Sequence, residues 1–201
     1  MRKGFTLVEM LVVMGIIAIL VGASITGFSK ITRAAENTKC NELVYNVATA
    51  MATIYQQQGA WPRRIVAKGD SESLLDADAA VALKGYLSLN VNDDGKLVGL
   101  DRLGVITPWA TAVLKRVGKS ASPSTKVPGG DGQSTLEDHI LRYAVDSDGD
   151  GIVTASVGGE AVNIRGVVAV WCCGRDGKIE SYSVGRRKDD IYSWTPGQVQ
   201  E

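Results

Sequence analysis

Three aspartates at alternating positions form a pattern typical of a calcium-binding loop. Asp146, Asp148 and Asp150 place carboxylates at positions 1, 3 and 5 of such a loop, where hard oxygen ligands converge on one cation. Gly151 occupies position 6, where the loop turns sharply, whereas Val157 stands at position 12, where a complete loop has a bidentate glutamate. The pattern therefore predicts either a calcium site with a reduced ligand set or an acidic turn between two strands.

A single carboxylate also lies inside the first apolar stretch of the chain. Residues 5–28 are apolar or small, with the exceptions of Thr6, Glu9, Ser24 and Thr26. As an α-helix this stretch would be ~36 Å long, which is sufficient to cross the ~30 Å hydrocarbon core of a bilayer. A charged side chain costs roughly 2.5–3.5 kcal/mol near the bilayer centre, so its presence predicts a functional role and a partner for Glu9.

The residues that flank the apolar stretch leave two interpretations open. Arg2 and Lys3 precede it, and by the positive-inside rule they would keep this end in the cytoplasm and place the rest of the chain outside. Alternatively, the small residues at 21–23 would form a secretory cleavage site, which would release a chain that begins at Ser24. The second interpretation leaves Glu9 without a role.

The residues around Glu9 resemble the processing site of type IV pilins and of type II secretion pseudopilins. The chain opens with MRKGFTLVE, and an apolar stretch follows. The resemblance implies that prepilin peptidase cuts between Gly4 and Phe5 and that the new amino terminus is methylated. It also implies that Glu9 pairs with the terminal amine of a neighbouring subunit. Such pairing would neutralise both charges in an apolar fibre core, where a lone carboxylate is unfavourable.

Helical periodicity continues beyond the apolar stretch. Apolar residues recur at spacings of 4, 3 and 4, namely Leu43, Val47, Ala50 and Ile54. This spacing predicts one long helix over residues 5–58, which Gly59 and Pro62 would end. The second half of the helix would pack on a head domain through its apolar face.

A shorter helix and a small sheet are expected in the head. The pattern of leucine and alanine predicts a helix over residues 72–85, with Ser71 or Asp70 as its N-cap. Residues 118–134 are rich in Gly, Pro and Ser, which predicts an exposed loop. β-branched and aromatic residues between turn residues predict three strands, namely residues 140–145, 162–172 and 179–184.

The strand pattern and the long helix together predict an α+β fold. Residues 167–171 show no alternation of apolar and polar types, which predicts a strand covered on both faces, one of them by the long helix. The resemblance implies the type IV pilin-like form of this fold, with a long N-terminal helix packed on a small antiparallel sheet.

The C-terminal segment resembles the end of the major pseudopilins. Residues 170–177 read VWCCGRDG and residues 188–197 read KDDIYSWTPG. The resemblance implies a structural calcium held by the side chains of Asp176, Asp189 and Asp190 and by the backbone carbonyls of Cys173 and Lys178. Three carboxylates on one irregular loop would repel one another unless a divalent cation neutralised them.

Three cysteines allow at most one internal disulfide. Cys172 and Cys173 are neighbours on a predicted strand, so their side chains point to opposite faces and only one of them could meet Cys40. We expect buried free thiols. A disulfide from Cys40 to another subunit is the alternative in an oxidising compartment.

Charge and composition argue against an enzyme and against a nucleic-acid-binding protein. The 22 basic and 22 acidic residues balance, and Cys40 is preceded by five basic and two acidic residues, so the remainder carries an acidic excess. This excess offers no basic stripe for phosphates. His139 is the single histidine of the chain, and no nucleophile stands beside a base in a recognisable motif.

The resemblance implies a structural subunit of a type II secretion pseudopilus. Its parts would be a leader (1–4), a transmembrane and fibre-core helix (5–29) and a periplasmic head (30–201). The implied partners are other copies of the chain, further pilin-like subunits, prepilin peptidase and an inner-membrane assembly platform, and the implied role is support of protein secretion. The alternatives are a type IV pilin for adhesion, motility or DNA uptake, and a secreted calcium-binding module.

Overall fold

The computed structural model describes residues 6–66, 71–128, 134–184 and 190–200, without the side chains of residues 23–30 and 184. It contains two compact units, Met1–Thr38 and Lys39–Glu201. The helix α1 (Leu7–Gln58) contributes residues to both units. The expected division into a leader, a membrane helix and a head stays a prediction.

The first unit exposes apolar side chains along α1. All side chains from Thr6 to Gly22 are exposed, and Leu7, Leu11 and Ile19 have exposed fractions of 83%, 67% and 73%. Among the residues that the structure describes, no helix has both the length and the apolar character needed to cross a membrane. The membrane helix expected over residues 5–29 includes residues outside the described part of the chain.

The residues of α1 in the second unit turn one face toward a large core. The buried side chains of this face are Cys40, Val44, Val47, Ala50, Met51 and Ile54. They confirm the predicted periodicity, and Leu43 packs beside them as a half-buried residue. The predicted end of the helix at Gln58 is also confirmed. Gly59 ends it with a φ of 65°, and its N–H donates to the carbonyl of Tyr55 at 2.8 Å.

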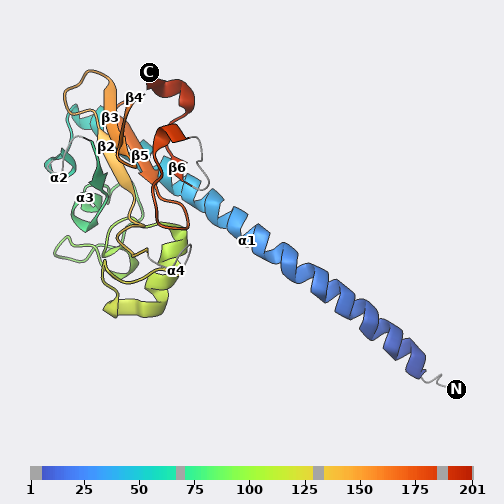
Figure 1. Ribbon diagram of the computed structural model, residues 1–201. Coiled ribbons are helices and arrows are strands. Elements are labelled where there is room, and N and C mark those ends of the chain that lie inside the picture. The colour runs from blue at the N-terminus through green and yellow to red at the C-terminus, as the bar shows by residue number, and fades with distance from the viewer. Residues whose placement is uncertain (1–5, 67–70, 129–133, 185–189, 201) are drawn as a thin grey trace. The chain divides into compact units, whose positions relative to one another are not determined.

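The described part of the second unit contains two antiparallel sheets (Figure 1). The four-stranded sheet has the order β1 (Ser73–Leu74), β2 (Arg142–Val145), β5 (Val168–Cys172) and β6 (Ile191–Tyr192). The three-stranded sheet has the order β3 (Ile152–Val157), β4 (Glu160–Arg165) and β7 (Val199–Gln200). Gly158 and Gly159 join β3 to β4 with φ values of 59° and 83°, which suit a two-residue hairpin turn.

The strand β5 lies between two apolar cores. Val170 and Cys172 belong to the core that includes α1, whereas Ala169 and Trp171 belong to a second core with β3 and β4. This arrangement confirms the predicted strand with two covered faces, one of them covered by the long helix. The absence of alternation in its sequence follows from this burial on both sides.

Short helices complete the head. They are α2 (Arg63–Val66), α3 (Ala77–Val81), α4 (Pro108–Val117) and the 3₁₀ turns η1 (Gly99–Asp101), η2 (Gly118–Ser120), η3 (Tyr182–Val184) and η4 (Pro196–Gln198). The sequence did not predict α4, although Pro108 at its first position is a typical start for a helix.

The helix predicted over residues 72–85 is wrong at both ends. Residues 73 and 74 form β1, which pairs with β2, and α3 begins only after Asp76. The Oδ1 atom of Asp76 accepts the N–H of Ala79 at 3.0 Å. The N-cap is therefore Asp76 rather than Ser71 or Asp70, because pairing with a distant strand overrides the local helical pattern.

Two of the three predicted strands need correction. Residues 162–172 do not form one strand, because Gly166 adopts a φ of 151° and separates β4 from β5, which lie in different sheets. Residues 179–184 form no strand. They include the 3₁₀ turn η3, and the strand that pairs with β5 is β6. The strand predicted over residues 140–145 is confirmed as β2.

Candidate functional site

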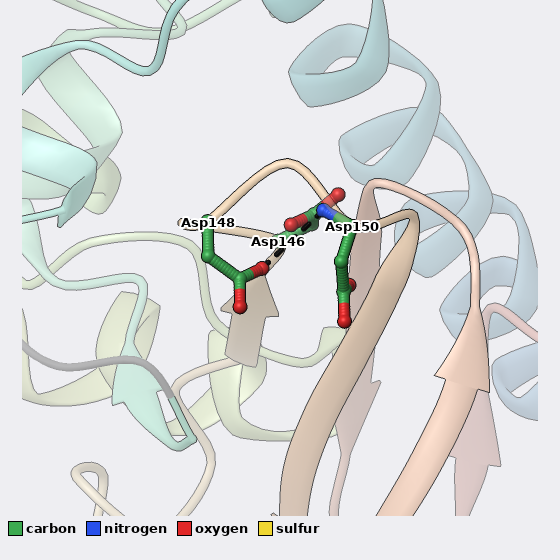
Figure 2. Close-up of side chains that lie close together, drawn as sticks. All are labelled: Asp146, Asp148 and Asp150. Atoms are coloured by element: carbon green, nitrogen blue, oxygen red, sulfur yellow. Dashed lines mark hydrogen bonds between the residues drawn. The ribbon is translucent and has the colours of Figure 1, made fainter.

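The turn between β2 and β3 brings the first three aspartates together (Figure 2). Ligand oxygens of Asp146, Asp148 and Asp150 lie within 4.8 Å of one another. Asp146 is buried and the other two aspartates are exposed. Among the described residues, this is the one group of three or more acidic, histidine or cysteine side chains close enough to hold a metal ion.

Hydrogen bonds to the backbone fix the buried carboxylate of this turn. Oδ1 of Asp146 accepts the N–H of Gly149 at 2.7 Å, and Oδ2 accepts the N–H of Gly151 at 2.8 Å. The carbonyl of Asp146 accepts the indole N–H of Trp61 at 2.7 Å. The ring of Trp61 stacks on Tyr55 near the end of α1, with centroids 4.8 Å apart. The turn is therefore held by a local network and by a contact to the end of the long helix.

The donor set of the turn fits a calcium ion in its chemistry. Calcium prefers carboxylate and carbonyl oxygens and takes about 6–8 of them. The two oxygens of Asp146 each accept one backbone N–H, and each retains a lone pair for a cation. Three carboxylates cannot fill the shell alone, so backbone carbonyls or solvent would supply the remaining ligands. The same hydrogen bonds also stabilise the turn as an ordinary acidic turn, so both predicted interpretations are compatible with this geometry.

The C-terminal loop is arranged differently. Oδ1 of Asp190 accepts the N–H of Gly174 at 2.9 Å, and Oδ2 accepts the N–H of Glu180 at 3.0 Å. Asp176 accepts the N–H of Lys178 at 3.0 Å. Asp189 lies outside the described residues. Asp190 thus joins both sides of the turn through hydrogen bonds, which is the bridging role that the resemblance assigns to calcium.

Within the described part of the chain, the predicted ligands of the C-terminal loop do not form a cluster that could hold a metal ion. Asp176 and Asp190 belong to no group of three ligating side chains within the described part of the chain. Cys173 directly follows β5, and its Sγ donates to the carbonyl of Asp138 at 3.0 Å. The calcium site proposed for Asp176, Asp189, Asp190 and the carbonyls of Cys173 and Lys178 stays a prediction.

His139 is the centre of a buried polar cluster that the sequence did not predict. The indole N–H of Trp109 donates to Nδ1 of His139 at 2.9 Å, so the neutral ring carries its proton on Nε2. Nε2 lies 3.3 Å from Oγ of Ser134, and Nδ1 lies 3.4 Å from Sγ of Cys173. Burial lowers the pKa of His139 from 6.5 to about 4. His139 is therefore neutral at pH 7 and connects α4, the segment before β2 and the end of β5.

The first turn of α1 holds the carboxylate of Glu9. Oε2 of Glu9 accepts the N–H and the hydroxyl of Thr6, both at 2.8 Å. The Oγ1 atom of Thr6 accepts the N–H of Glu9 at 3.3 Å in return. This reciprocal arrangement is a capping box, and the spacing Thr-x-x-Glu is its typical sequence pattern. A negative side chain in the first turn also favours the helix through its dipole.

The positions before Thr6 belong to the processing site that the sequence predicts. Residues 1–25 match the family model of the prokaryotic N-terminal methylation motif. Neither a curated protein nor a solved structure matches the chain. Gly4 and Phe5 fall within the methylation motif but outside the described residues.

The methylation motif indicates the class of protein to which the N-terminal segment is similar. It supports a type IV pilin-like or pseudopilin chain that is a substrate of prepilin peptidase, and it implies a membrane-anchored precursor that assembles into fibres. The α+β fold, with its N-terminal helix and small antiparallel sheets, is compatible with such a chain. The matched segment ends within α1, so the methylation motif says nothing about the head.

Proposed function

We propose that this chain is a structural subunit of a type II secretion pseudopilus. The observation that carries the proposal is the methylation motif over residues 1–25, combined with a helix whose apolar side chains are exposed and whose first turn contains one carboxylate. Prepilin peptidase would cut after Gly4 and methylate Phe5. No catalytic role is proposed for the chain itself.

The exposed apolar side chains from Leu7 to Val21 need a nonpolar environment. The bilayer would supply it before assembly, with Arg2 and Lys3 on the cytoplasmic side and the head in the periplasm. Neighbouring copies of the same helix would supply it in the fibre. An inner-membrane platform would transfer the subunit from one environment to the other. The resulting pilin-like fibre would support the passage of secreted proteins.

Glu9 has a defined role in this assembly. In the single chain its carboxylate caps α1 through Thr6. In the fibre the same carboxylate would pair with the methylated terminal amine of a neighbouring subunit. A carboxylate oxygen accepts more than one hydrogen bond, so both roles are compatible.

Calcium would act in the head as a structural ion. Asp146, Asp148 and Asp150 bring three carboxylates close together, which supports a site there, whereas the resemblance to the major pseudopilins supports a site at Asp176, Asp189 and Asp190. In either place the ion would supply charge neutralisation and bridging rather than catalysis.

Substitution of Glu9 by glutamine tests the assembly mechanism. We expect the variant to be cleaved and methylated as the parent chain is, while fibre assembly drops by at least about tenfold because the charge pair is lost. Glu42, an exposed residue of α1 outside the methylation motif, provides the control variant Glu42→Gln, which should assemble normally. Normal fibres from Glu9→Gln would refute the pairing.

Mass spectrometry of the protein from its native membrane fraction tests the class of function. An intact mass and N-terminal fragments that begin at methylated Phe5 support the fibre subunit. A chain that begins at Ser24 would show a freely secreted protein instead. Deletion of the gene then distinguishes the two kinds of fibre. Loss of extracellular enzymes supports a secretion pseudopilus, whereas loss of adhesion, motility or DNA uptake supports a type IV pilus.

A further inference from the structure

All three cysteines are buried free thiols in the structure, as expected, and two of them meet inside the head. The Sγ atoms of Cys40 on α1 and Cys172 on β5 lie 2.9 Å apart, and both residues have an exposed fraction of 0%. The distance is within about 1 Å of a disulfide bond length. We propose that Cys40 and Cys172 form an intrachain disulfide that ties the long helix to the central strand of the head.

The two sulfur atoms are carried by elements that are fixed independently of them. Cys172 pairs with Ile191 of β6 in the four-stranded sheet. Cys40 lies in the interior of α1, where Val44 and Val47 fix the buried face of the helix in the same core. The packing of the helix on the sheet therefore brings the thiols together without any need for the bond.

The neighbouring Cys173 cannot compete for Cys40. Its Sγ contacts the carbonyl of Asp138 at 3.0 Å and lies 3.4 Å from Nδ1 of His139. Cys173 directly follows β5, and these contacts make it part of the polar cluster around His139 rather than a neighbour of Cys40. The fold thus selects one pairing and leaves Cys173 as a buried thiol.

The disulfide would form by thiol–disulfide exchange with another oxidised protein. The two thiols lose two protons and two electrons when the Cys40–Cys172 bond forms. An oxidised protein dithiol, the class of oxidant found in the periplasm, accepts them as its own disulfide bond breaks. The exchange proceeds through a mixed disulfide with one of the two cysteines, from which the second thiol displaces the oxidant.

The burial of both residues places this reaction before the completion of folding. The contact with Cys40 and burial both raise the pKa of Cys172, which keeps the folded chain in the unreactive thiol form. The bond would therefore form while α1 is still docking on β5. Once formed, it closes a loop across 132 positions and transmits a pull on α1 directly to the sheet.

Peptide mapping of the full-length chain tests the proposal. The protein is taken from its native membrane fraction into detergent without reductant, its free thiols are alkylated under denaturing conditions, and the digest is analysed by mass spectrometry. We expect an intact mass lower by two hydrogens than that of the reduced chain, one crosslinked peptide pair that contains Cys40, and a single alkylated cysteine.

Two variants assign the crosslink. Cys173→Ser should retain the crosslink, because Cys173 takes no part in it, and Cys172→Ser should lose it. If Cys172→Ser fails to fold, fragmentation of the wild-type pair still decides whether Cys172 or Cys173 carries the bond. Three alkylated cysteines, a bond at Cys173 or a covalent dimer through Cys40 would each overturn the proposal.

The oxidation rests on the periplasmic position of the head in the proposed function, but one experiment distinguishes a failure of the disulfide from a failure of that function. The same digest contains the N-terminal peptide, which reports whether the chain begins at Phe5. A crosslink without that processing would support the disulfide and refute the fibre subunit, whereas processing without a crosslink would do the reverse.

Discussion

In both aspartate turns of the head, an aspartate carboxylate accepts hydrogen bonds from backbone N–H groups, but the bonds span different lengths of chain. In the turn after β2, Asp146 accepts backbone N–H groups three and five residues ahead and so gathers its own neighbours. In the C-terminal loop, Asp190 accepts N–H groups 16 and 10 residues behind it and so closes a long segment. The local turn collects three carboxylates, whereas within the described part of the chain Asp176 joins no such group. Aspartates that are close in sequence thus form a cluster in the turn that folds on itself.

The glycines of the two turns provide the largest contrast. Gly149 and Gly177 have nearly equal φ values of 79° and 77°, but an added Cβ at Gly149 meets nothing within 4 Å. At Gly177 it would lie 2.2 Å from Cβ of Ser134 and 3.2 Å from Nε2 of His139. Gly149→Ala should cost about 1–2 kcal/mol for the backbone alone. Gly177→Ala should cost about 2–5 kcal/mol, because the clash adds to it.

Thermal unfolding of the two alanine variants in detergent, followed by tryptophan fluorescence, measures this difference. Equal losses of stability would show that the C-terminal turn is not packed against the His139 cluster. A larger loss for Gly149→Ala would reverse the comparison between the turns.

Acid should weaken the packing around the C-terminal turn through His139. The pKa of His139 is about 4 in the folded chain and 6.5 ordinarily, because burial disfavours the charged ring. As the pH falls through 6.5, His139 takes up a proton in the unfolded chain, whereas in the folded chain it stays neutral until about pH 4. The contribution to stability is therefore flat above pH 6.5 and falls by about 3 kcal/mol between pH 6.5 and 4.

Denaturant unfolding of the parent chain and of His139→Gln over this pH range isolates the effect. The variant should show a smaller loss of stability between pH 6.5 and 4. The charged groups near the ring are Asp138, Asp176 and Arg142, and they do not change the direction of the shift. Parallel pH profiles would contradict the assignment of the acid sensitivity to His139.

Calcium binding should give the smallest of these changes in stability, and it should differ between the two turns. A ligand at about 100 times its Kd stabilises the folded state by about 2.7 kcal/mol. If the turn after β2 binds the ion, Asp148→Asn combined with Asp150→Asn should abolish the calcium-dependent rise in Tm. Asp190→Asn should leave the rise in place, and the opposite result would move the site to the C-terminal loop.

A chelator added to the purified chain provides the matching control for the calcium experiment. Removal of the ion should lower the Tm of the parent chain and leave the double variant unchanged. An unchanged Tm in the parent, together with no heat of calcium binding, would remove the structural ion from both turns.

The parts of the fold that follow from local pattern were predictable from the sequence. The end of α1 at Gly59, the strand β2 and the two covered faces of β5 all depend on periodicity or on a single turn residue. The cluster of Asp146 with its neighbours was also predictable, since the hydrogen bonds of its carboxylates span five residues at most.

The parts that depend on distant partners were not predictable. β1 and β6 are two residues long and exist because β2 and β5 offer them backbone groups. His139 acquires Trp109 from α4, 30 residues earlier in the chain, and no spacing in the sequence announces this contact. The Thr6–Glu9 capping box is different, because the spacing Thr-x-x-Glu is sufficient to predict it from the sequence.

The contact between Trp61 and the carbonyl of Asp146 makes the β2–β3 turn optically observable. The indole N–H donates a hydrogen bond to the carbonyl of Asp146 at 2.7 Å, while the ring stacks on Tyr55. A cation drawn to the three carboxylates would polarise the carbonyl that this indole contacts. The emission of Trp61 would then change without any label. A Trp61→Phe chain, which retains the other three tryptophans, would lose this change. The chain therefore contains its own reporter for the state of the turn beside the end of the long helix.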